Sequence, residues 1–319
     1  MTKIKVGVIG VGALGWHHAR LYKECDQAEL VGIYDLDEES GENVAEKLAT
    51  RYFKSPVALL EAVDAVSIAV PAHLHFEIGQ RVIEAKKHIL MEKPLTEFLD
   101  HGRKLLEMAK ENDCIIQVGH VERFNPIIAV MEEKLTDPRF IEVHRLSPYP
   151  PQRPGQKPRG TEVGVVLDLM IHDLEMILNL VDSEVELIDV VGVPILSSTE
   201  DIANVRLRFE NGCVANLTAS RVTNEPVRKM RIFQSDAYVS LDYQEKSGEI
   251  YWKDETGIQH KTILVDDHNA LLKQLEHFLK CVAGYMATGN IPAPKVSGEQ
   301  GFKALELAVK IREKIQLSS

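Results

Sequence analysis

The sequence has few cysteines, only four among 319 residues. They stand at positions 25, 114, 213 and 281, and no two of them form a Cys-x-x-Cys pair. This spacing is typical of neither a disulfide framework nor a zinc site. We therefore expect reduced, mostly buried thiols, as in a cytoplasmic protein.

An excess of positive charge is also missing, because the formal net charge is −11. An acidic surface repels phosphate groups, so we expect no nucleic-acid partner. The basic residues do not gather into one run, which argues against binding to an anionic membrane surface. The apolar run in the N-terminal segment MTKIKVGVIGVG is too short for a signal sequence or a membrane-spanning helix.

The first part of the chain alternates between short apolar segments and amphipathic ones, which predicts βαβ units and a parallel sheet buried on both faces. We expect strands at 3–9, 28–35, 65–70, 88–94 and 114–120, and helices at 16–25, 37–50, 75–87 and 98–112.

The pattern changes after residue 139, where β-rich segments follow one another with short links. This order predicts a large, mostly antiparallel open sheet. The Asn-Gly pair at 211–212 indicates a hairpin. Two amphipathic helices, 268–284 and 298–316, close the chain. Because the open face of such a sheet needs covering, we expect a homodimer or homotetramer.

A glycine-rich turn, GVGALG, follows the first expected strand and opens a helix. In this context Gly10-x-Gly12-x-x-Gly15 is the dinucleotide-binding fingerprint, with Ala13 and Leu14 inside it. Gly10 permits the tight turn, Gly12 lets the backbone approach the pyrophosphate, and Gly15 lets helix and strand pack closely. The helix N-terminus then offers N–H groups to the phosphates.

An acidic residue, Asp35, ends the second expected strand. Its carboxylate can accept a hydrogen bond from a ribose 2′-OH and would repel a 2′-phosphate. The residues that follow it, LDEES, supply no arginine. We therefore expect NAD as the cofactor and favour it over NADP.

The segment LDLMIHDLEMILNL predicts a helix with two stripes. The apolar stripe comprises Leu167, Met170, Ile171, Leu174, Ile177, Leu178 and Val181, and beside it lie Asp168, His172, Glu175 and Asn179. Positions four apart face the same way, so Asp168 can orient the ring of His172 as a general acid or base requires. An ordinary Asp–His pair at the edge of a core remains an alternative.

Further along the sheet, MEKPLT places Glu92, Lys93 and Pro94 at the carboxyl end of a strand, where open α/β sheets bind ligands. Together with the glycine turn, the acidic end of the second strand and the D-x-x-x-H helix, this motif resembles the Gfo/Idh/MocA oxidoreductases over essentially the whole chain. The segments GHVERFNP and DLMIHD resemble more narrowly the branch that acts on UDP-N-acetylhexosamines, among them UDP-N-acetylglucosamine 3-dehydrogenases.

The resemblance implies an α/β fold with a Rossmann domain, expected at 1–122, and a substrate-binding and oligomerisation domain, expected at 123–319, with the active site between them. We expect the C-terminal helix to pack back on the first domain. The resemblance assigns Lys93, Asp168 and His172 to catalysis and implies a cis Lys93–Pro94 bond. It also places Pro71 and His75, with Glu92 and Lys93, at the cofactor.

Other polar residues have two interpretations each. Glu122, Arg123 and Asn125 fall at the domain junction, within reach of a substrate. The basic residues Arg145, Arg153, Lys157 and Arg159 flank or occupy a proline-rich loop, which could hold a diphosphate or be a solvated surface. His17 and His18 either lie near the nicotinamide or are exposed. We expect no metal site, since His73-x-His75 lacks further ligands at a supporting spacing.

The expected activity is an NAD-dependent oxidation of a secondary hydroxyl in a sugar, in particular a nucleotide sugar such as UDP-N-acetylglucosamine at its 3-position. A free-sugar or inositol-type dehydrogenase of the same family is one alternative. A non-catalytic NAD-binding sensor is another, although it would have no need for Lys93 and His172 together.

Overall fold

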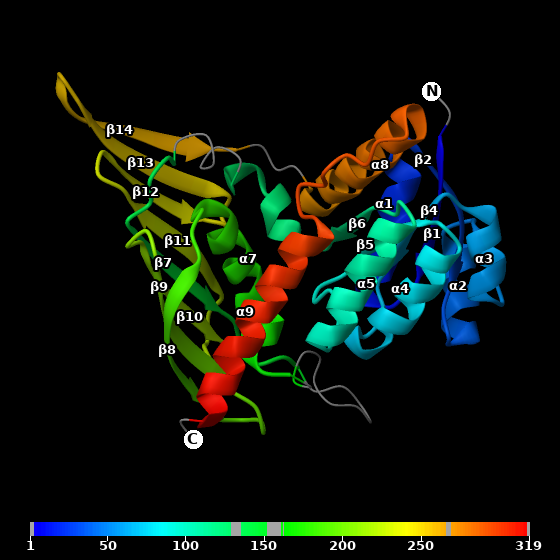
Figure 1. Cartoon of the computed structure of the whole chain (residues 1–319), viewed down its shortest axis with the longest axis horizontal. Helices are drawn as coiled ribbons and strands as arrows, with labels where there is room; N and C mark the ends of the chain where they lie inside the picture. Colours follow the sequence, from blue (N-terminus) through cyan, green and yellow to red (C-terminus); the bar gives the residue numbers. More distant parts are fainter. Residues whose placement is uncertain (1–2, 129–134, 152–160, 162, 266–268, 318–319) are drawn as a thin grey trace. The chain divides into compact units, whose positions relative to one another are not determined.

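The computed structural model describes residues 3–128, 135–151, 161, 163–265 and 269–317, which are coloured along the chain in Figure 1. The chain divides into two compact units. The first comprises Met1–Phe124 and His268–Phe302, and the second Asn125–Asp267 and Lys303–Ser319. The first unit thus includes one of the two C-terminal helices, in addition to the N-terminal segment that the sequence predicts for it.

The first unit is built on a six-stranded parallel sheet in the order β3-β2-β1-β4-β5-β6. Its strands are β1 (Ile4–Ile9), β2 (Ala28–Tyr34), β3 (Arg51–Tyr52), β4 (Ala65–Ile68), β5 (His88–Met91) and β6 (Ile116–Val118). This is the order of the Rossmann fold, in which ligands bind outside the carboxyl ends of the strands near β1 and β4. The predicted parallel sheet is confirmed.

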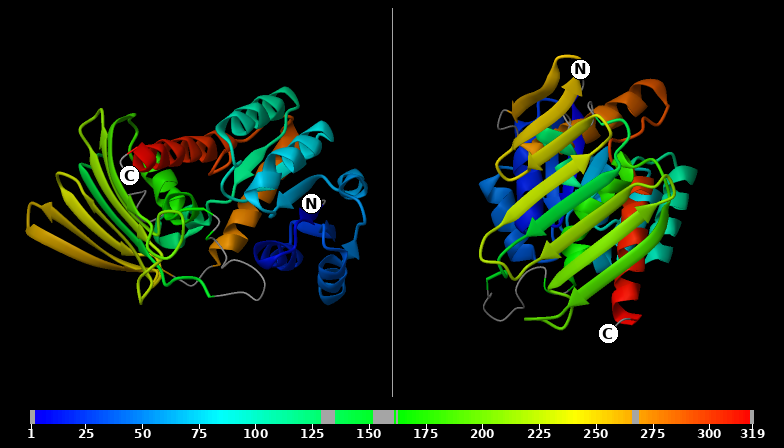
Figure 2. Two further views of the ribbon diagram at one scale, coloured as in Figure 1. Left: turned by 90° about the horizontal axis from the view of Figure 1, so that it is seen from below. Right: turned by 90° about the vertical axis from the view of Figure 1, so that its left-hand side faces the viewer.

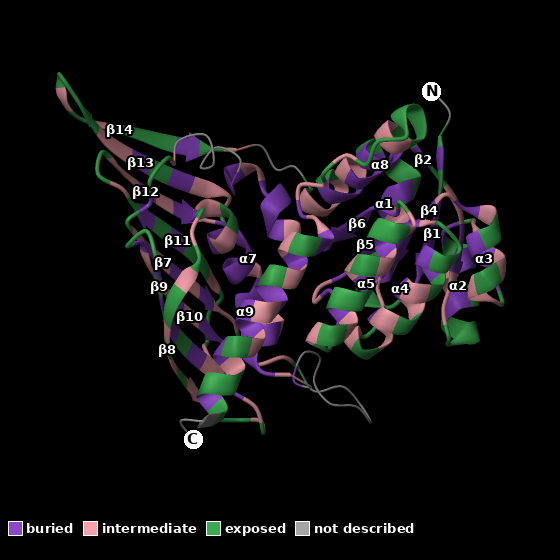
Figure 3. Ribbon diagram, in the orientation of Figure 1, coloured by how far each residue is buried: buried purple, intermediate pink, exposed green. Residues whose placement is uncertain are grey.

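Helices connect these strands: α1 (Ala13–Glu24), α2 (Glu38–Lys47), α3 (Pro56–Ala62), α4 (His75–Glu84) and α5 (Leu99–Glu111), with short 3₁₀ turns η1 (Ala72–Leu74) and η2 (Val121–Phe124). The sequence analysis did not predict β3 and α3, which are too short to show a clear period. Strands β1, β4, β5 and β6 are almost wholly buried, as expected for a sheet covered on both faces, whereas β2 and β3 at one edge are less buried (Figure 3).

Helix α8 (Ala270–Thr288) also belongs to the first unit, where it packs on α1. Leu275, Phe278 and Val282 of this helix share one hydrophobic cluster with Val6 and Tyr22. The C-terminal helix itself, α9 (Gly298–Leu317), is divided between the two units after Phe302.

The second unit contains an eight-stranded sheet in the order β14-β13-β12-β11-β7-β10-β9-β8. All neighbouring strands are antiparallel except β7 and β10. The strands are β7 (Phe140–Leu146), β8 (Val185–Val193), β9 (Ile202–Phe209), β10 (Val214–Ser220), β11 (Val227–Phe233), β12 (Ala237–Asp242), β13 (Ser247–Asp254) and β14 (Gly257–Leu264). The hairpin at 211–212 is confirmed, with Gly212 at φ +85°.

One face of this sheet is covered by α7 (Ile171–Leu180) and by α9 (Gly298–Leu317), whose Ile315 packs on Gly192 of β8. The right-hand view of Figure 2 looks onto the other face, and no helix among the described residues crosses it. Side chains on β7 and on β9 to β12 alternate between buried and less buried positions (Figure 3). The alternation is what a sheet with one solvent face requires.

A row of stacked rings runs over this uncovered face. It consists of Phe140, Phe233, Tyr238, Tyr251 and His260, one on each of five neighbouring strands. The ring centroids of successive members lie 4.4 to 5.9 Å apart. Such cross-strand aromatic pairs stabilise the register of a sheet.

The helix expected around the D-x-x-x-H motif differs from the prediction in one respect. Its first turn, η3 (Val166–Met170), is π-helical, and α7 follows it directly. A single π turn inside a helix widens the local repeat, and such turns are frequent at functional sites. The predicted apolar stripe is buried except for Leu178, which is half-buried, and Glu175 is buried as well.

Candidate functional site

The glycine turn joins β1 to α1 and has the geometry that a pyrophosphate needs. Gly10 has φ +83°, and a Cβ atom on Gly15 would lie 1.8 Å from the carbonyl oxygen of Gly10. Both glycines are therefore required by the protein's own backbone. A Cβ atom on Gly12 would meet nothing within 4 Å. Because Gly12 has no side chain, there is open space beside the N-terminus of α1. This space fits a phosphate group bound by backbone N–H groups.

Ala13 and Leu14 form the exposed first turn of α1, which carries no acidic side chain to compete with an anion. At the end of β2, the carboxylate of Asp35 accepts a hydrogen bond from the N–H of Val11 at 2.7 Å and another from Asp37 at 3.0 Å. Asp35 thus also holds the glycine turn in place. A carboxylate has about four lone-pair directions, so acceptor capacity remains for a ribose hydroxyl.

The carboxyl end of β5 carries Glu92, Lys93 and Pro94, and the implied cis Lys93–Pro94 bond is confirmed. Lys93 is half-buried, whereas Glu92 is buried. Nε2 of His18 on α1 lies 3.0 Å from Oε1 of Glu92, and the His18 ring is fully buried. His17, by contrast, is exposed. The structure therefore distinguishes the two histidines that the sequence left undecided.

The segment after β4 contributes Pro71, which is exposed and precedes η1. His75, the first residue of α4, is buried, with Nδ1 2.8 Å from the carbonyl oxygen of Pro94 and Nε2 2.9 Å from that of Val70. Burial lowers the pKa of His75. Because both ring nitrogens face backbone carbonyls, His75 connects the ends of β4 and β5 and supports the cofactor edge from within the protein.

His120, which the sequence analysis did not single out, follows β6 at the same edge of the sheet. It is buried, and burial lowers its pKa to about 3, with further lowering by the positive charges of Lys93 and Arg123. The ring is therefore neutral at physiological pH and lies within the electrostatic reach of Lys93. Its place at the carboxyl end of a strand adjacent to β5 is the signal that could have identified it.

The residues expected at the domain junction are buried. Glu122 and Arg123 lie in η2 of the first unit. Asn125 belongs to the second unit, where its amide nitrogen is 3.4 Å from the carbonyl oxygen of Tyr243 and its oxygen accepts from the N–H of Ile127. The amide of Asn125 thus has a structural part in fixing the chain that enters the second unit.

In the second unit, Asp168 lies in the π-helical turn and His172 is the second residue of α7, and both are half-buried. The start of this segment is held by Glu200 from the loop before β9. A Cβ atom on Gly164 would lie 1.9 Å from the Glu200 carboxyl group, whose Oε1 is 3.4 Å from the N–H of Val166. An acidic group at a helix N-terminus stabilises that end of the helix.

Buried hydrogen bonds of Arg221 also hold the residues just before the π-helical turn. Nη1 of Arg221 donates to the carbonyl oxygen of Val163, and its Nε donates to Asp201 at 2.7 Å. Burial alone would raise the pKa of Asp201, but hydrogen bonds from Leu196 and other backbone N–H groups, together with Arg221, hold it well below its usual range. These groups position the D-x-x-x-H segment relative to the sheet.

Arg145, which the sequence placed beside the basic loop, points into the core and pairs with Asp173 of α7. Arg145 is therefore a structural residue of the second unit. The sequence analysis assigned no role to its partner, Asp173. Arg153, Lys157 and Arg159 lie outside the described residues.

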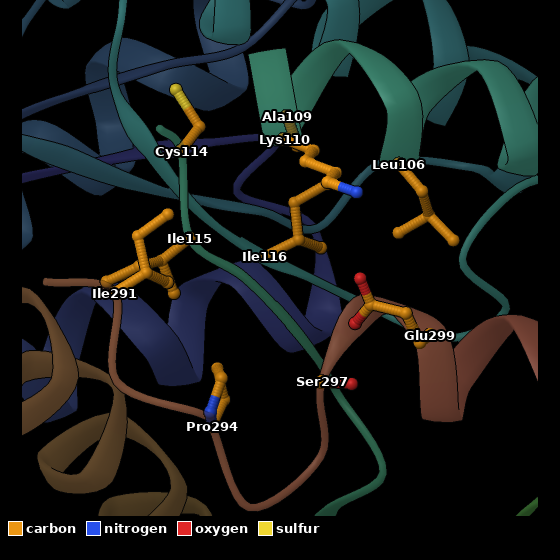
Figure 4. Close-up of a pocket in the computed structure, with 11 residues that line it drawn as sticks. Leu106, Ala109, Lys110, Cys114, Ile115, Ile116, Ile291, Pro294, Ser297 and Glu299 are labelled. Carbon is orange, nitrogen blue, oxygen red and sulfur yellow. The ribbon is translucent and has the colours of Figure 1, made fainter. Parts of the chain in front are cut away.

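A separate cavity of about 140 Å³ lies in the first unit (Figure 4). Leu106, Ile116 and Ile291 make it largely apolar, with Lys110 and Glu299 beside it. Ile116 begins β6, so the cavity is at the amino end of this strand, away from Lys93 and the glycine turn.

Among the described residues, no group of three or more His, Cys, Asp or Glu side chains could hold a metal ion. The same residues contain no helix long and apolar enough to cross a membrane.

Comparison with known proteins identifies relatives across the chain. Residues 4–120 match the model of an oxidoreductase family with an NAD-binding Rossmann fold, Gfo/Idh/MocA, and residues 129–240 match the Gfo/Idh/MocA C-terminal domain. A UDP-N-acetylglucosamine 3-dehydrogenase of Acidithiobacillus ferrooxidans is 34% identical over 99% of this chain and 98% of its own. A solved structure of that enzyme superposes with a TM-score of 0.91, with 99% of each chain covered. A myo-inositol 2-dehydrogenase of Thermotoga maritima is 27% identical over 98% of this chain and 96% of its own.

Proposed function

Because the chain belongs to the Gfo/Idh/MocA family of oxidoreductases with an NAD-binding Rossmann fold, we propose that it oxidises a secondary hydroxyl of a nucleotide sugar, UDP-N-acetylglucosamine at its 3-position. The observation that carries the proposal is the joint presence of three features. These are a glycine turn with open space for a phosphate, Lys93 at the carboxyl end of β5, and the Asp168-x-x-x-His172 segment. A sensor that only binds the dinucleotide would have no use for the last two.

A bound nicotinamide supplies the acceptor for the hydride that leaves the substrate carbon. His172 takes the proton of the hydroxyl on that carbon, and Asp168 orients the His172 ring. The ammonium of Lys93 donates a hydrogen bond to the reacting oxygen and stabilises its alkoxide character. Gly10, Gly12, Ala13, Leu14 and Gly15 bind the pyrophosphate through their backbone, and Pro71 borders the same ligand.

NAD is the proposed cofactor in preference to NADP. The support is the negative charge of Asp35 at the end of β2, where a 2′-phosphate would have to lie. Glu122 and Arg123 at the carboxyl edge of the first unit, and Arg153 and Arg159 in the basic loop, are the proposed substrate-binding residues. The guanidinium group of arginine can bind two oxygens of a phosphate at once, so arginine residues suit a diphosphate.

The substrate proposal is supported by the identity of 34% to a UDP-N-acetylglucosamine 3-dehydrogenase. The similarity to a myo-inositol 2-dehydrogenase favours one second candidate, a cyclitol or free-sugar dehydrogenase. NADH formation with UDP-N-acetylglucosamine, glucose and myo-inositol distinguishes them. Reduction of NAD by the nucleotide sugar alone supports the proposal, and reduction by inositol alone supports the second candidate. A protein that binds NADH but oxidises none of a broad panel of sugars is the sensor.

The catalytic assignment has its own test. His172→Ala and Lys93→Ala should each lower turnover, the former by about 100- to 10,000-fold, because general-base catalysis is typically worth that much. NADH binding, measured by fluorescence, should persist in both. If the two residues act on one step, the double variant should lose much less than the product of the single losses. Wild-type turnover in His172→Ala would exclude the assigned base.

The uncovered face of the eight-stranded sheet is the proposed homodimer or homotetramer interface. Leu187, Val191 and Val193 are exposed on its edge strand β8, beyond the row of stacked rings. Such exposed apolar residues on an edge strand mark association sites. Val191→Lys with Val193→Lys should lower the mass in sedimentation, while Val57→Lys, an exposed apolar position on α3, should not. A wild-type monomer would exclude the interface.

The four free, buried cysteines fit the proposed cytoplasmic location.

A further inference from the structure

The residues on either side of Lys93 each contact a buried histidine. His75 approaches the carbonyl oxygen of Pro94 on the C-terminal side, at 2.8 Å. On the N-terminal side, His18 approaches the side chain of Glu92, at 3.0 Å. His18 and His75 are 0% and 1% exposed, so neither contact competes with water. A hydrogen bond that is shielded from water restrains its partners more strongly than an exposed one.

The carboxylate of Glu92 has little freedom to move away from His18. A Cβ atom on Gly119 would lie 2.7 Å from Oε1 of Glu92 and 2.9 Å from its Oε2, so this carboxylate rests directly against the backbone after β6. The N–H of Glu92 donates to the carbonyl oxygen of Ile68 at 3.0 Å. Glu92 is thus fixed by α1, β4 and the end of β6 together.

The ring of His18 makes a hydrogen bond to the Glu92 carboxylate through its Nε2 atom. Its Nδ1 atom is buried and has no hydrogen-bond partner among the described residues, so the bond from Nε2 to Glu92 is what compensates the burial of a polar ring. His18 stands three residues after Gly15 and four before Tyr22, on the buried side of α1. The helix whose N-terminus faces the phosphates therefore also reaches the residue that precedes Lys93.

We propose that His18 is a positioning residue that acts through Glu92 to set the place of Lys93, and so connects the glycine-turn helix to the lysine at the reacting oxygen. The inference rests on the proposed function of Lys93. Glu92 then contributes to the site by holding Lys93 and not by direct recognition of the cofactor. Displacement of a catalytic group by about 1 Å can cost roughly 100-fold in rate.

The test compares variants in two backgrounds. His18→Leu removes the donor and should lower kcat by about 10- to 100-fold with little change in the KM for NAD, because the glycine turn is intact. His18→Gln keeps a neutral donor near the place of Nε2 and should recover most of that loss. His17→Leu, on the exposed side of the same helix, is the matched control and should behave as wild type.

The deciding measurement places His18→Leu in a Lys93→Ala background. If His18 acts through Lys93, the second substitution should have no further effect on kcat. A full additional loss there would overturn the inference, since the histidine would then act by another route. Wild-type kcat in Lys93→Ala alone would instead overturn the proposed function of the lysine. The two failures are therefore distinguishable.

A second variant keeps the test independent of the folding of His18→Leu. Gly119→Ala places a methyl group against the Glu92 carboxylate from the other side and should displace it. The same signature is expected, a loss of kcat that is absent in the Lys93→Ala background. Wild-type kcat in both Gly119→Ala and His18→Leu, with folding confirmed by circular dichroism, would also overturn the inference.

Discussion

Arg145 of β7 and Asp173 of α7 form a bidentate ion pair in the core of the second unit, with Nε to Oδ2 at 2.7 Å and Nη2 to Oδ1 at 2.8 Å. Their side chains are only 5% and 2% exposed. The pair attaches the helix that carries His172 to the middle of the eight-stranded sheet. Both charged groups are shielded from water, so the ion pair offsets part of the cost of burying each of them.

Removal of one partner should therefore be far more damaging than removal of both. Arg145→Met removes the guanidinium that makes two hydrogen bonds to the buried Asp173 carboxylate, and should lower the free energy of unfolding by about 3–5 kcal/mol. Arg145→Met combined with Asp173→Leu should recover most of this loss, because the carboxylate that lost its guanidinium partner is then no longer buried in the core. Urea denaturation of the three variants measures the difference. A double variant that is no more stable than Arg145→Met would contradict the explanation.

The glycine turn offers a matched pair of substitutions. Gly12→Ala adds a methyl group in open space at φ −63°, so the fold should tolerate it, yet it should weaken NADH binding by blocking the pyrophosphate. Gly15→Ala puts the same methyl group 1.8 Å from the oxygen of Gly10 and should destabilise the first unit itself. Fluorescence titration with NADH and thermal unfolding separate the two effects. Equal NADH affinity in Gly12→Ala and wild type would exclude the assigned phosphate position.

Asp35 decides between the two dinucleotides in the proposed function. Asp35→Asn keeps an oxygen acceptor for the N–H of Val11 but removes the charge that repels a 2′-phosphate. The ratio of kcat/KM for NADP to that for NAD should rise by up to about tenfold, which corresponds to roughly 1.4 kcal/mol. Asp37→Asn, two residues further along, is the charge control. An unchanged ratio in Asp35→Asn would show that discrimination lies elsewhere.

His88 should make the first unit sensitive to acid. Its Nδ1 accepts the N–H of Ile115 at 3.1 Å, so the ring is neutral in the folded protein, and burial lowers its pKa from 6.5 to about 4. Between these values the unfolded chain binds more protons than the folded one. The free energy of unfolding should therefore fall as the pH is lowered from about 6.5 to about 4, with this residue contributing up to about 2 kcal/mol at pH 5.

His88→Asn keeps an acceptor for Ile115 without a titratable group. The variant should show a smaller loss of stability between pH 7 and pH 5 than the wild type, in urea or thermal denaturation at both values. His260→Asn, on the exposed row of stacked rings, should keep the wild-type slope. Identical slopes for His88→Asn and wild type would contradict the assignment of this ring as a neutral acceptor.

Much of the first unit could be predicted because its signals are local. The glycine spacing, the apolar strands and the residues that follow them are each readable within a short window, and parallel strands bring their carboxyl ends to one edge without further information. β3 and α3 were missed because two and seven residues are too few to establish a period. In the second unit the β-rich composition predicted a large, mostly antiparallel sheet, but it did not predict the order of the strands or the parallel pair β7 and β10.

By itself, the sequence determined the parallel sheet of the first unit, the large, mostly antiparallel sheet of the second, the candidate residues Lys93, Asp168 and His172, and the family resemblance. The tertiary structure alone decided which distant groups support them. His18 and Glu92 are 74 positions apart, and Arg145 and Asp173 are 28 apart. No short-range pattern encodes such pairs, because their contact depends on which helix packs over which strand end. The burial of a polar side chain, and hence its partner, is a property of the assembled core and not of its own segment.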